Sequence, residues 1–397
     1  MKFRVERDVL SEAVAWTARS LPSRPAAPVL AGLVFEAVES EGGEGDNGSV
    51  TLSGFDYEVS SRAQIGADVT EPGRILIHGK LLADIAKSLP NRPVEFSTEG
   101  SKVLVSCGSS RFTLQTLPVE DYPALPTMPT ATGAVTASGL ASAVSQVAIA
   151  AGRDDTIPML TGIRVEIEGE KITLVATDRF RLAVRELQWK PEQQDMSATS
   201  LIPSKVLSDT AKALTGGDWV TLALSGGDAG EGLIGFESGD GASSGAKGSR
   251  RMTSRLLSGE FVKYRSLFPS EYNITATVET APFLEAAKRV SLVADRTSPI
   301  KLAFTQGEVT LEAGAGDEAQ ASEAMDAVLD GEDISVSFNP SFLLDGLQVI
   351  DTQYAQLSFT VASKPAVLMG RPALDAPPQE EFRYLMMPLR VPGQSAG

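Results

Sequence analysis

The stretch "PVLAGLVFEAVES" at residues 28–40 returns in similar form as "PMLTGIRVEIEGE" at 158–170 and as "PIKLAFTQGEVT" at 299–310. The leading residues Pro28, Pro158 and Pro299 are 130 and 141 residues apart. Two recurrences at a near-constant spacing indicate one structural unit used three times.

The flanks of these stretches repeat as well. Each copy begins with a short strand and an apolar stripe at helical spacing, and a second such stripe follows further along the chain. Between them lies a strand-turn-strand pattern whose turn carries Asp56, Asp178 or Asp317. In the third copy Asn339 and Pro340 have the residue types of a helix N-cap and first turn.

Each copy therefore predicts two helices and about eight short strands, an α+β layer with an antiparallel sheet. We expect three tandem domains at 1–128, 129–271 and 272–397, with a flexible tail at 392–397. Two Gly-rich loops, at 39–49 and 225–249, are expected to be flexible excursions. A row of three domains leaves two sheet edges open, which head-to-tail joining of two chains would close.

Composition restricts the chemistry. The 397 residues include one histidine, His78, and one cysteine, Cys107, so a multi-histidine metal site and an internal disulfide are excluded. A Ser-His-Asp triad would need His78, which is expected only to start a helix. We therefore predict no catalytic residue, metal or cofactor. No signal peptide or membrane span is expected, and the free cysteine fits a cytoplasmic protein.

The net charge of −16 disfavours broad nucleic-acid affinity, but charge is unevenly distributed. The segment Leu302–Ser363 has eleven acidic residues and no Lys or Arg, whereas residues 249–251 and 287–289 are locally basic. An acidic protein with one basic face is compatible with this pattern.

Over the whole chain, the triple repeat together with "MKFRVERDVL" at 1–10, "RPAAPVL" at 24–30, "RFTLQTLP" at 111–118, "ATDRFRLAV" at 176–184 and "RYLMMPLR" at 383–390 resembles the bacterial DNA polymerase III β subunit, the sliding clamp. The resemblance implies a non-catalytic homodimeric ring of six domains, cytoplasmic and nucleoid-associated. Such a ring encircles duplex DNA without sequence preference and tethers the α subunit of the polymerase. It also implies a clamp loader, and other polymerases, ligase and mismatch-repair proteins that bind through short peptides.

The family's partner pocket lies between the second and third domains. The resemblance carries it to Leu160, Thr177, Arg179, Phe180, Arg181, Leu182, Val262, Ser266, Leu267, Asn339, Phe342, Ser363, Pro365, Leu385, Met387, Pro388, Leu389 and Arg390. Met387 and Leu389 would offer adaptable apolar surface, and Arg181 and Arg390 could orient a peptide.

Three features depart from the family pattern. Arg179-Phe180 stands where relatives often have Gly-His, Ser266 replaces a basic residue of some relatives, and the chain continues past Val391. These changes alter the rim of the expected pocket, and the added tail could flank it.

For DNA contact the resemblance and the repeat point to Arg24, Lys80, Arg153 and Lys205. For the dimer interface they point to Ile85, Arg111, Phe112 and Leu114 of one protomer against Leu292 and Val293 of the other.

Two other functions compete with the clamp. A hydrolase could use Asp56 and Asp178 as paired carboxylates, although turn chemistry explains matched aspartates better. A repeat-built scaffold that never touches DNA would suit the acidic charge. No phosphate-binding loop of the G-x-x-x-x-G-K-[ST] kind occurs in the sequence.

Overall fold

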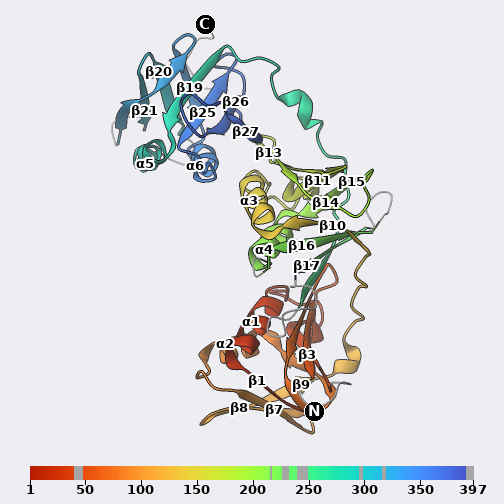
Figure 1. Ribbon diagram of the computed structural model, residues 1–397. Helices are drawn as coiled ribbons and strands as arrows, with labels where there is room; N and C mark the ends of the chain where they lie inside the picture. Colours follow the sequence, from red (N-terminus) through yellow and green to blue (C-terminus); the bar gives the residue numbers. More distant parts are fainter. Residues whose placement is uncertain are drawn as a thin grey trace. The chain divides into compact units, whose positions relative to one another are not determined.

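The computed structural model describes residues 1–39, 48–214, 217–225, 232–238, 249–294, 298–314 and 319–389. Most of the two Gly-rich loops, Asp317, Arg390 and the tail lie outside the described residues. Within the described part, each repeat contains two helices and nine strands, close to the expected number of about eight strands. Figure 1 labels the helices and many of the strands.

The six helices of the described residues form three matched pairs. They are α1 (Arg7–Ala18) and α2 (Gly79–Ser88), α3 (Ala137–Ala148) and α4 (Ser204–Ala213), and α5 (Thr280–Ser291) and α6 (Pro340–Gln348). His78 caps α2 by accepting the Leu81 N–H at Nδ1, and Asn339 caps α6 by accepting the Ser341 N–H at 2.9 Å. Both helix starts confirm the sequence prediction.

The strands of the first repeat are β1 (Lys2–Val5), β2 (Gly32–Val38), β3 (Ser49–Phe55), β4 (Val59–Gly66), β5 (Asp68–Glu71), β6 (Gly73–His78), β7 (Val94–Glu99), β8 (Lys102–Cys107) and β9 (Ser110–Leu117). Those of the second are β10 (Ala131–Thr136), β11 (Gly162–Glu168), β12 (Lys171–Thr177), β13 (Arg181–Gln188), β14 (Lys190–Pro191), β15 (Ser197–Pro203), β16 (Trp219–Leu224), β17 (Leu233–Ser238) and β18 (Arg250–Arg255). Those of the third are β19 (Ile274–Glu279), β20 (Ile300–Thr305), β21 (Glu308–Ala313), β22 (Ala321–Asp326), β23 (Val328–Asp330), β24 (Ile334–Phe338), β25 (Tyr354–Phe359), β26 (Ala366–Arg371) and β27 (Gln379–Met386).

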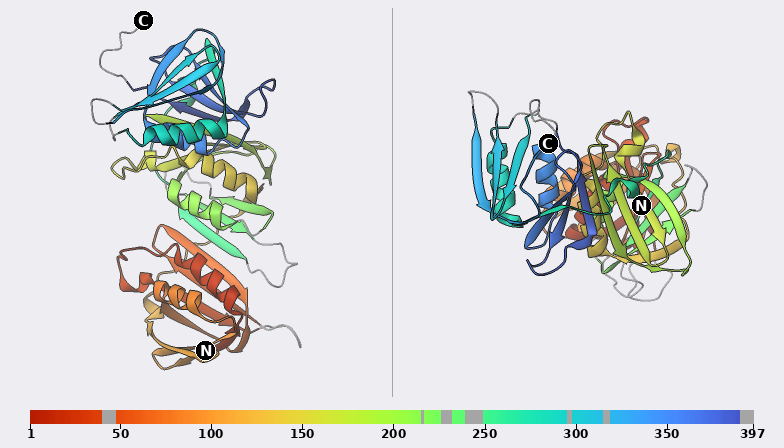
Figure 2. Two further views of the ribbon diagram at one scale, coloured as in Figure 1. Left: turned by 90° about the vertical axis from the view of Figure 1, so that its left-hand side faces the viewer. Right: turned by 90° about the horizontal axis from the view of Figure 1, so that it is seen from above.

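The described residues group into two compact units, and the second repeat contributes to both. The first unit comprises Met1–Leu140, Trp189–Gln194 and Asp209–Leu256. Its antiparallel sheet has the order β14-β10-β16-β17-β18-β4-β3-β2-β6-β9-β8-β7-β1-β5, so the first repeat's strands continue into the second's through β4 and β18. Helices α1 and α2 pack side by side, and α1 contacts β3 and β4 (Figure 2).

The second unit comprises Ala141–Gln188, Asp195–Ser208 and Leu257–Gly397. It holds a sheet of order β15-β11-β12-β13-β27-β26-β25-β19-β23 and a second of order β22-β21-β20-β24. The second and third repeats therefore share one sheet through β13 and β27. Helices α5 and α6 pack against each other, as α1 and α2 do (Figure 1).

The proline-led stretches differ in one respect. Pro28 and Pro158 each open a short 3₁₀ helix, whereas Pro299 directly precedes β20. Strand register pairs Gly32 with His78 and Gly162 with Pro203, while Ile300 pairs with Phe338, one residue before the N-cap Asn339. Pro299 therefore corresponds to Gly32 and Gly162, and the sequence match was offset by four residues. None of the helices in the described ranges has the length and apolar character needed to cross a bilayer.

Gly346 allows α6 to approach β27 closely. A Cβ on Gly346 would lie 2.5 Å from the ring of the fully buried Tyr384. The matched residues of α2 and α4, Ile85 and Thr210, are larger, so the requirement for glycine is specific to the third repeat.

Gly346→Ala should destabilise the protein by about 1–3 kcal/mol, because the methyl group overpacks the contact with Tyr384. Urea unfolding followed by circular dichroism would measure this. Gly66→Ala is the matched control, since a Cβ there meets nothing within 4 Å. Equal stability of the two variants would contradict the close contact.

Candidate functional site

The turn between β12 and β13 is built around Asp178. Its Oδ1 accepts the backbone N–H groups of Phe180 and Arg181, both at 3.0 Å. Arg179 takes a left-handed conformation with φ of 80°, and Phe180 is left 59% exposed. Asp56 makes the same turn in the first repeat, with Tyr57 at φ of 76°. Both aspartates therefore stabilise turns, so there is no reason to assign them as the paired carboxylates of a hydrolase.

Arg181 is the polar centre of the region, and its side chain is only 6% exposed. Its Nε donates to Asp178 at 3.0 Å, and its Nη1 donates to Asp345 on α6 at 2.6 Å. The guanidinium also lies 4.4 Å from the centre of the Phe342 ring and donates to the Tyr384 hydroxyl. One side chain of the second repeat thereby joins a helix and a strand of the third.

The electrostatics keep Arg181 charged. Burial by itself disfavours the cation, but Tyr384 and the carboxylates of Asp345 and Asp178 outweigh burial and raise the pKa of Arg181 above its ordinary value. Burial also raises the pKa of Tyr384, whose hydroxyl donates to the Phe342 carbonyl at 3.0 Å. A buried pair of this kind is costly to break, because the remaining charge would lose its partner.

β27 and the segment that follows it, Met387–Leu389, make backbone hydrogen bonds to both the second and the third repeat. β27 pairs with β13 from Arg181↔Met386 to Arg185↔Phe382. Beyond the strand, the Met387 N–H donates to the Phe180 carbonyl at 2.9 Å, and the Leu389 N–H donates to the Ser337 carbonyl at 2.8 Å. The side chains of Met387 and Leu389 are exposed. The structure thus holds apolar side chains beside the Asp178 turn.

A second covering element is the segment Leu257–Asn273 between β18 and β19, here called the strap. Its residues Phe261 and Tyr264 are buried in one cluster with Leu182 and Leu385, and Val262 packs against that cluster. Ser266 and Leu267 are exposed on the strap. The strap therefore brings its predicted pocket residues to the sheet that carries β13 and β27.

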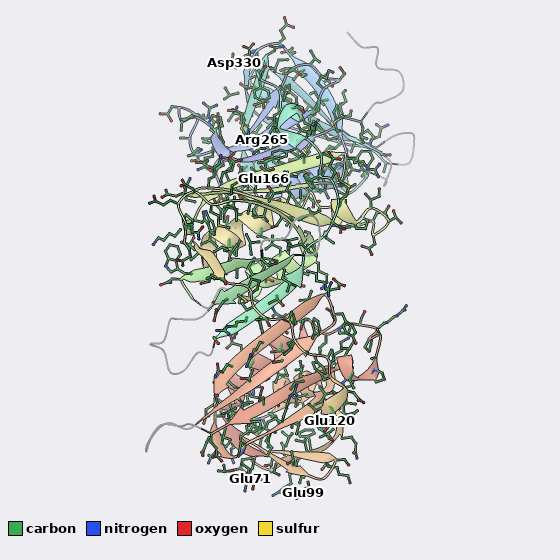
Figure 3. All side chains as sticks on the ribbon, turned by 90° about the vertical axis from the view of Figure 1, so that its right-hand side faces the viewer. Glu71, Glu99, Glu120, Glu166, Arg265 and Asp330 are labelled. Carbon is green, nitrogen blue, oxygen red and sulfur yellow. The ribbon has the colours of Figure 1, made fainter. Side chains whose placement is uncertain are left out.

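Glu166 on β11 anchors the strap (Figure 3). Its buried carboxylate accepts from the Tyr264 hydroxyl at 2.9 Å, from Arg265 at 2.6 Å and from Arg164 at 2.7 Å. Burial would raise the pKa of Glu166, but these hydrogen bonds and charges lower it overall, so the anchor stays ionised.

The other predicted pocket residues lie as follows. Leu160 is buried in the 3₁₀ helix before β11, and Thr177 is buried at the end of β12, where its hydroxyl donates to the Arg181 carbonyl. Ser363 and Pro365 lie between β25 and β26, and Pro388 between Met387 and Leu389. Buried Leu182 and Leu385 are opposite each other across the β13–β27 pair, and Asn339 caps α6.

The four predicted DNA residues fall into two matched pairs. Lys80, at the start of α2, donates to the Pro22 carbonyl at 3.4 Å, and Arg24 is exposed in the same loop. Arg153 and Lys205 line one open pocket of about 420 Å³ at the start of α4. In both repeats the loop after the first helix therefore lies beside the lysine that begins the second.

The predicted interface residues differ in exposure. Leu292 follows α5 and is 84% exposed, Arg111 is exposed, and Phe112 and Val293 are half-buried. Ile85 and Leu114 are buried within the first repeat. The first four are available for an interface, whereas the last two already serve the protomer's core.

Sequence reasoning missed Asp345, Tyr384 and Glu166 as parts of the site. Asp345 could have been suspected, because it lies beside the apolar stripe of its helix. The acidic segment around it, Leu302–Ser363, contains no Lys or Arg that could pair with it. Glu166 lies between Val165 and Ile167 in an apolar strand, and its partner Arg265 is far along the sequence. Nothing in the local pattern signals that contact.

Comparison with known families covers almost the whole chain. The family models of the DNA polymerase III beta subunit match with the N-terminal domain at residues 1–126, the central domain at 134–263 and the C-terminal domain at 265–390.

Among curated proteins, the beta sliding clamp of Streptomyces coelicolor is 61% identical over 99% of this chain and all of that protein. The beta sliding clamp homolog GriR of Streptomyces muensis is 48% identical over 98% and 99% of the two chains.

Solved structures agree. The DnaN sliding clamp of Pseudomonas aeruginosa bound to griselimycin matches with a TM-score of 0.85 at 27% identity, over 98% of this chain and all of that one. The Bacillus subtilis DNA polymerase sliding clamp matches with a TM-score of 0.84 at 26% identity, over 98% and 99%. With its three tandem α+β domains, this chain belongs to the bacterial DNA polymerase III β subunits, the non-catalytic sliding clamps.

Proposed function

We propose that two copies of this chain close head to tail into a six-domain ring that encircles duplex DNA and tethers the polymerase III α subunit. The proposed domains are 1–128, 129–271 and 272–397, and the matched family ranges support these bounds. The carrying observation is that consecutive repeats join by one strand-pairing rule. Among the described residues this rule leaves one edge of β22 in the third repeat, and most of one edge of β9 in the first, without a partner strand.

The first seam joins β4 to β18. β4 follows the Asp56 turn, and β18 is the last strand of the next repeat; Ser61 lies opposite Met252 and Arg62 opposite Arg251. The Ser60 and Thr253 hydroxyls hydrogen-bond at 2.6 Å, and Arg250 of β18 pairs with Glu12 of α1.

The second seam repeats the first. β13 follows the Asp178 turn and pairs with β27, the last strand of the third repeat, with Ala183 opposite Tyr384. In both seams the strand after the turn meets the final strand of the next repeat.

The same rule defines a third seam between chains. In the described residues β22 pairs only with β21, and β9 pairs with β8 along its length but with β6 only at Thr116 and Leu117. β22 is the matched strand of the third repeat, and β9 is the last strand of the first. Pairing them across two protomers would satisfy both open edges. The register of the first two seams predicts Phe112 opposite Ala321.

Leu292 supports this seam. The first seam places Arg250 against Glu12 and Trp16 of α1. Because α1 and α5 match residue by residue, the corresponding surface of the third repeat is formed by Glu285 and Arg289, with Leu292 one turn beyond Arg289. An exposed leucine at that place is explained by a partner strand.

A ring retains DNA by topology, so tight base contacts are unnecessary and would prevent sliding. We assign weak phosphate contact to Arg24, Lys80, Arg153 and Lys205. We assign partner binding to the exposed apolar side chains Phe180, Leu267, Met387 and Leu389 around the Arg181 cluster, together with the other predicted pocket residues. The clamp loader, other polymerases, ligase and mismatch-repair proteins are proposed to use the same pocket.

Leu292→Asp should convert the dimer to a monomer, because a buried charge at the centre of an interface is not compensated. Sedimentation velocity at micromolar concentration would show the change in mass. Leu374→Asp is the control, since Leu374 is also exposed but lies outside the seam. A Leu292→Asp dimer, or a monomeric wild type, would rule out this interface.

Leu389→Asp should weaken binding to the immobilised polymerase α subunit by about tenfold or more, while the dimer persists. The charge would occupy the apolar surface proposed to receive the partner. Surface plasmon resonance gives the affinity, and Leu374→Asp again controls for added charge. Undiminished affinity would place the partner elsewhere.

Replacing Lys80 and Lys205 by Ala should reduce the salt dependence of binding to a short DNA duplex. Each lost phosphate contact lowers the slope of log K against log salt by about 0.9. Fluorescence anisotropy between low and moderate salt would give the slope, and Lys364→Ala, an exposed lysine before β26, is the control. An unchanged slope would exclude these lysines from the DNA path.

A further inference from the structure

The three helix pairs can be compared residue by residue at their ends. The first helices α1, α3 and α5 each have twelve residues, so Arg7, Ala137 and Thr280 occupy matched positions. The second helices match through buried Leu82, Leu207 and Leu343, which places Gln348 of α6 at the position of Lys87 of α2.

In the first repeat a guanidinium group meets the end of the second helix. Arg7 donates from Nη2 to the Lys87 carbonyl in the last turn of α2 at 2.9 Å, and Asp8 lies 2.6 Å from its Nη1. The Arg7 side chain is three-quarters buried. A cation is favourable there, because the last carbonyl groups of a helix carry partial negative charge.

The second repeat obtains the same contact from another element. Arg250 of β18 donates from Nη1 to the Ala213 carbonyl at the end of α4, at 3.3 Å. Two repeats with different sequences therefore supply a guanidinium to the same kind of helix end.

The third repeat supplies none from the described residues. Thr280 stands in place of Arg7, and the Val349 carbonyl after α6 accepts from a neutral amide, Gln146 Nε2, at 3.1 Å. An open pocket of about 330 Å³ lies at this point, lined by Thr280 and Gln348, the two positions that match Arg7 and Lys87. Thr280 is 6% exposed, and its hydroxyl has no hydrogen-bond partner among the described residues.

The rest of the pocket lining is suited to a cation. Glu279 and Asp351 contribute carboxylates, and the described residues place no Lys or Arg in the pocket lining. Two carboxylates and a helix C-terminus together favour a planar cation with several N–H donors, which guanidinium provides. The pocket is less suited to a metal ion, because the described residues hold no group of three metal-ligating side chains.

We propose that the pocket between the start of α5 and the end of α6 binds a guanidinium group supplied from outside the chain. The ligand is an arginine side chain of a partner protein or a small guanidinium compound. In this site the ligand takes the place that Arg7 fills internally in the first repeat. The proposal concerns a surface separate from the Arg181 cluster and stands independently of the ring.

Methyl NMR on the full-length protein would test the proposal, with Ile350 of the pocket lining as the reporter. Methylguanidinium should shift the Ile350 δ1 methyl signal along a saturating curve, whereas tetramethylammonium at equal ionic strength should not. A capped Gly-Arg-Gly peptide that binds as well, with capped Gly-Lys-Gly weaker, would identify an arginine side chain as the source. Binding of methylguanidinium alone would identify a small molecule.

Variants of the pocket test the proposed binding site directly. Thr280→Arg restores the internal arginine and should abolish the shift, and Asp351→Asn, at an exposed carboxylate, should weaken binding roughly two- to fivefold. Glu332→Gln is the control, because Glu332 is an exposed carboxylate of the third repeat outside the pocket lining and outside the proposed seam, and it should leave binding unchanged. A wild-type shift no larger than that with tetramethylammonium, or equal binding by Asp351→Asn and wild type, would overturn the proposal.

Discussion

Open strand edges are the constraint on which the rest of this structure depends. Backbone N–H and C=O groups along a strand must be paired or hydrated, and an uncovered edge invites pairing with another chain. Here the strand after each repeat's turn cannot be covered by its own repeat. β4 and β13 are covered by β18 and β27 of the following repeats. Among the described residues β22 pairs only with β21, so its second edge is the one that the proposed dimer would cover with a strand of another chain.

The two internal seams share topology but differ in chemistry, and the difference explains where a binding site can form. The first seam is held by hydroxyl groups and by arginines at the surface, such as Arg255 on the Tyr57 carbonyl. The second contains the buried Arg181 with two carboxylates. A buried, fully paired charge fixes the geometry around it, since any displacement would strip the charge of its partners. The left-handed Arg179 is held in that rigid setting, and the turn can therefore leave Phe180 exposed beside Met387.

The sequence was informative where periodicity and repetition carry the signal. The helix pairs, the caps His78 and Asn339, and the turns at Asp56 and Asp178 follow from local patterns, and the family followed from motifs spread over the chain. The match of Pro299 to Pro28 was wrong because sequence similarity cannot detect a register offset, whereas the pairing of Ile300 with Phe338 fixes it. The contacts of Arg181 with Asp345 and of Glu166 with Arg265 join residues distant in sequence, and no local pattern encodes them. Ile85 and Leu114, which we expected at the interface, are buried in the first repeat, since the sequence of an apolar residue does not distinguish an interface from a core.

The distribution of lysines over the three repeats explains how an acidic chain can contact DNA. The first two repeats begin their second helices with Lys80 and Lys205 and end them near Lys87 and Lys212, whereas the third has Ser341 and Gln348 at those positions. Thr280 replaces Arg7 in the same repeat. The sequence of α6 therefore has no lysine at either end, within a repeat that already lacks Lys and Arg from Leu302 to Ser363. In the proposed ring, phosphate contact would therefore come from the first two domains of each chain. Because the third domain would not need to contact phosphate groups, it can carry an acidic surface that repels DNA and attracts cationic groups.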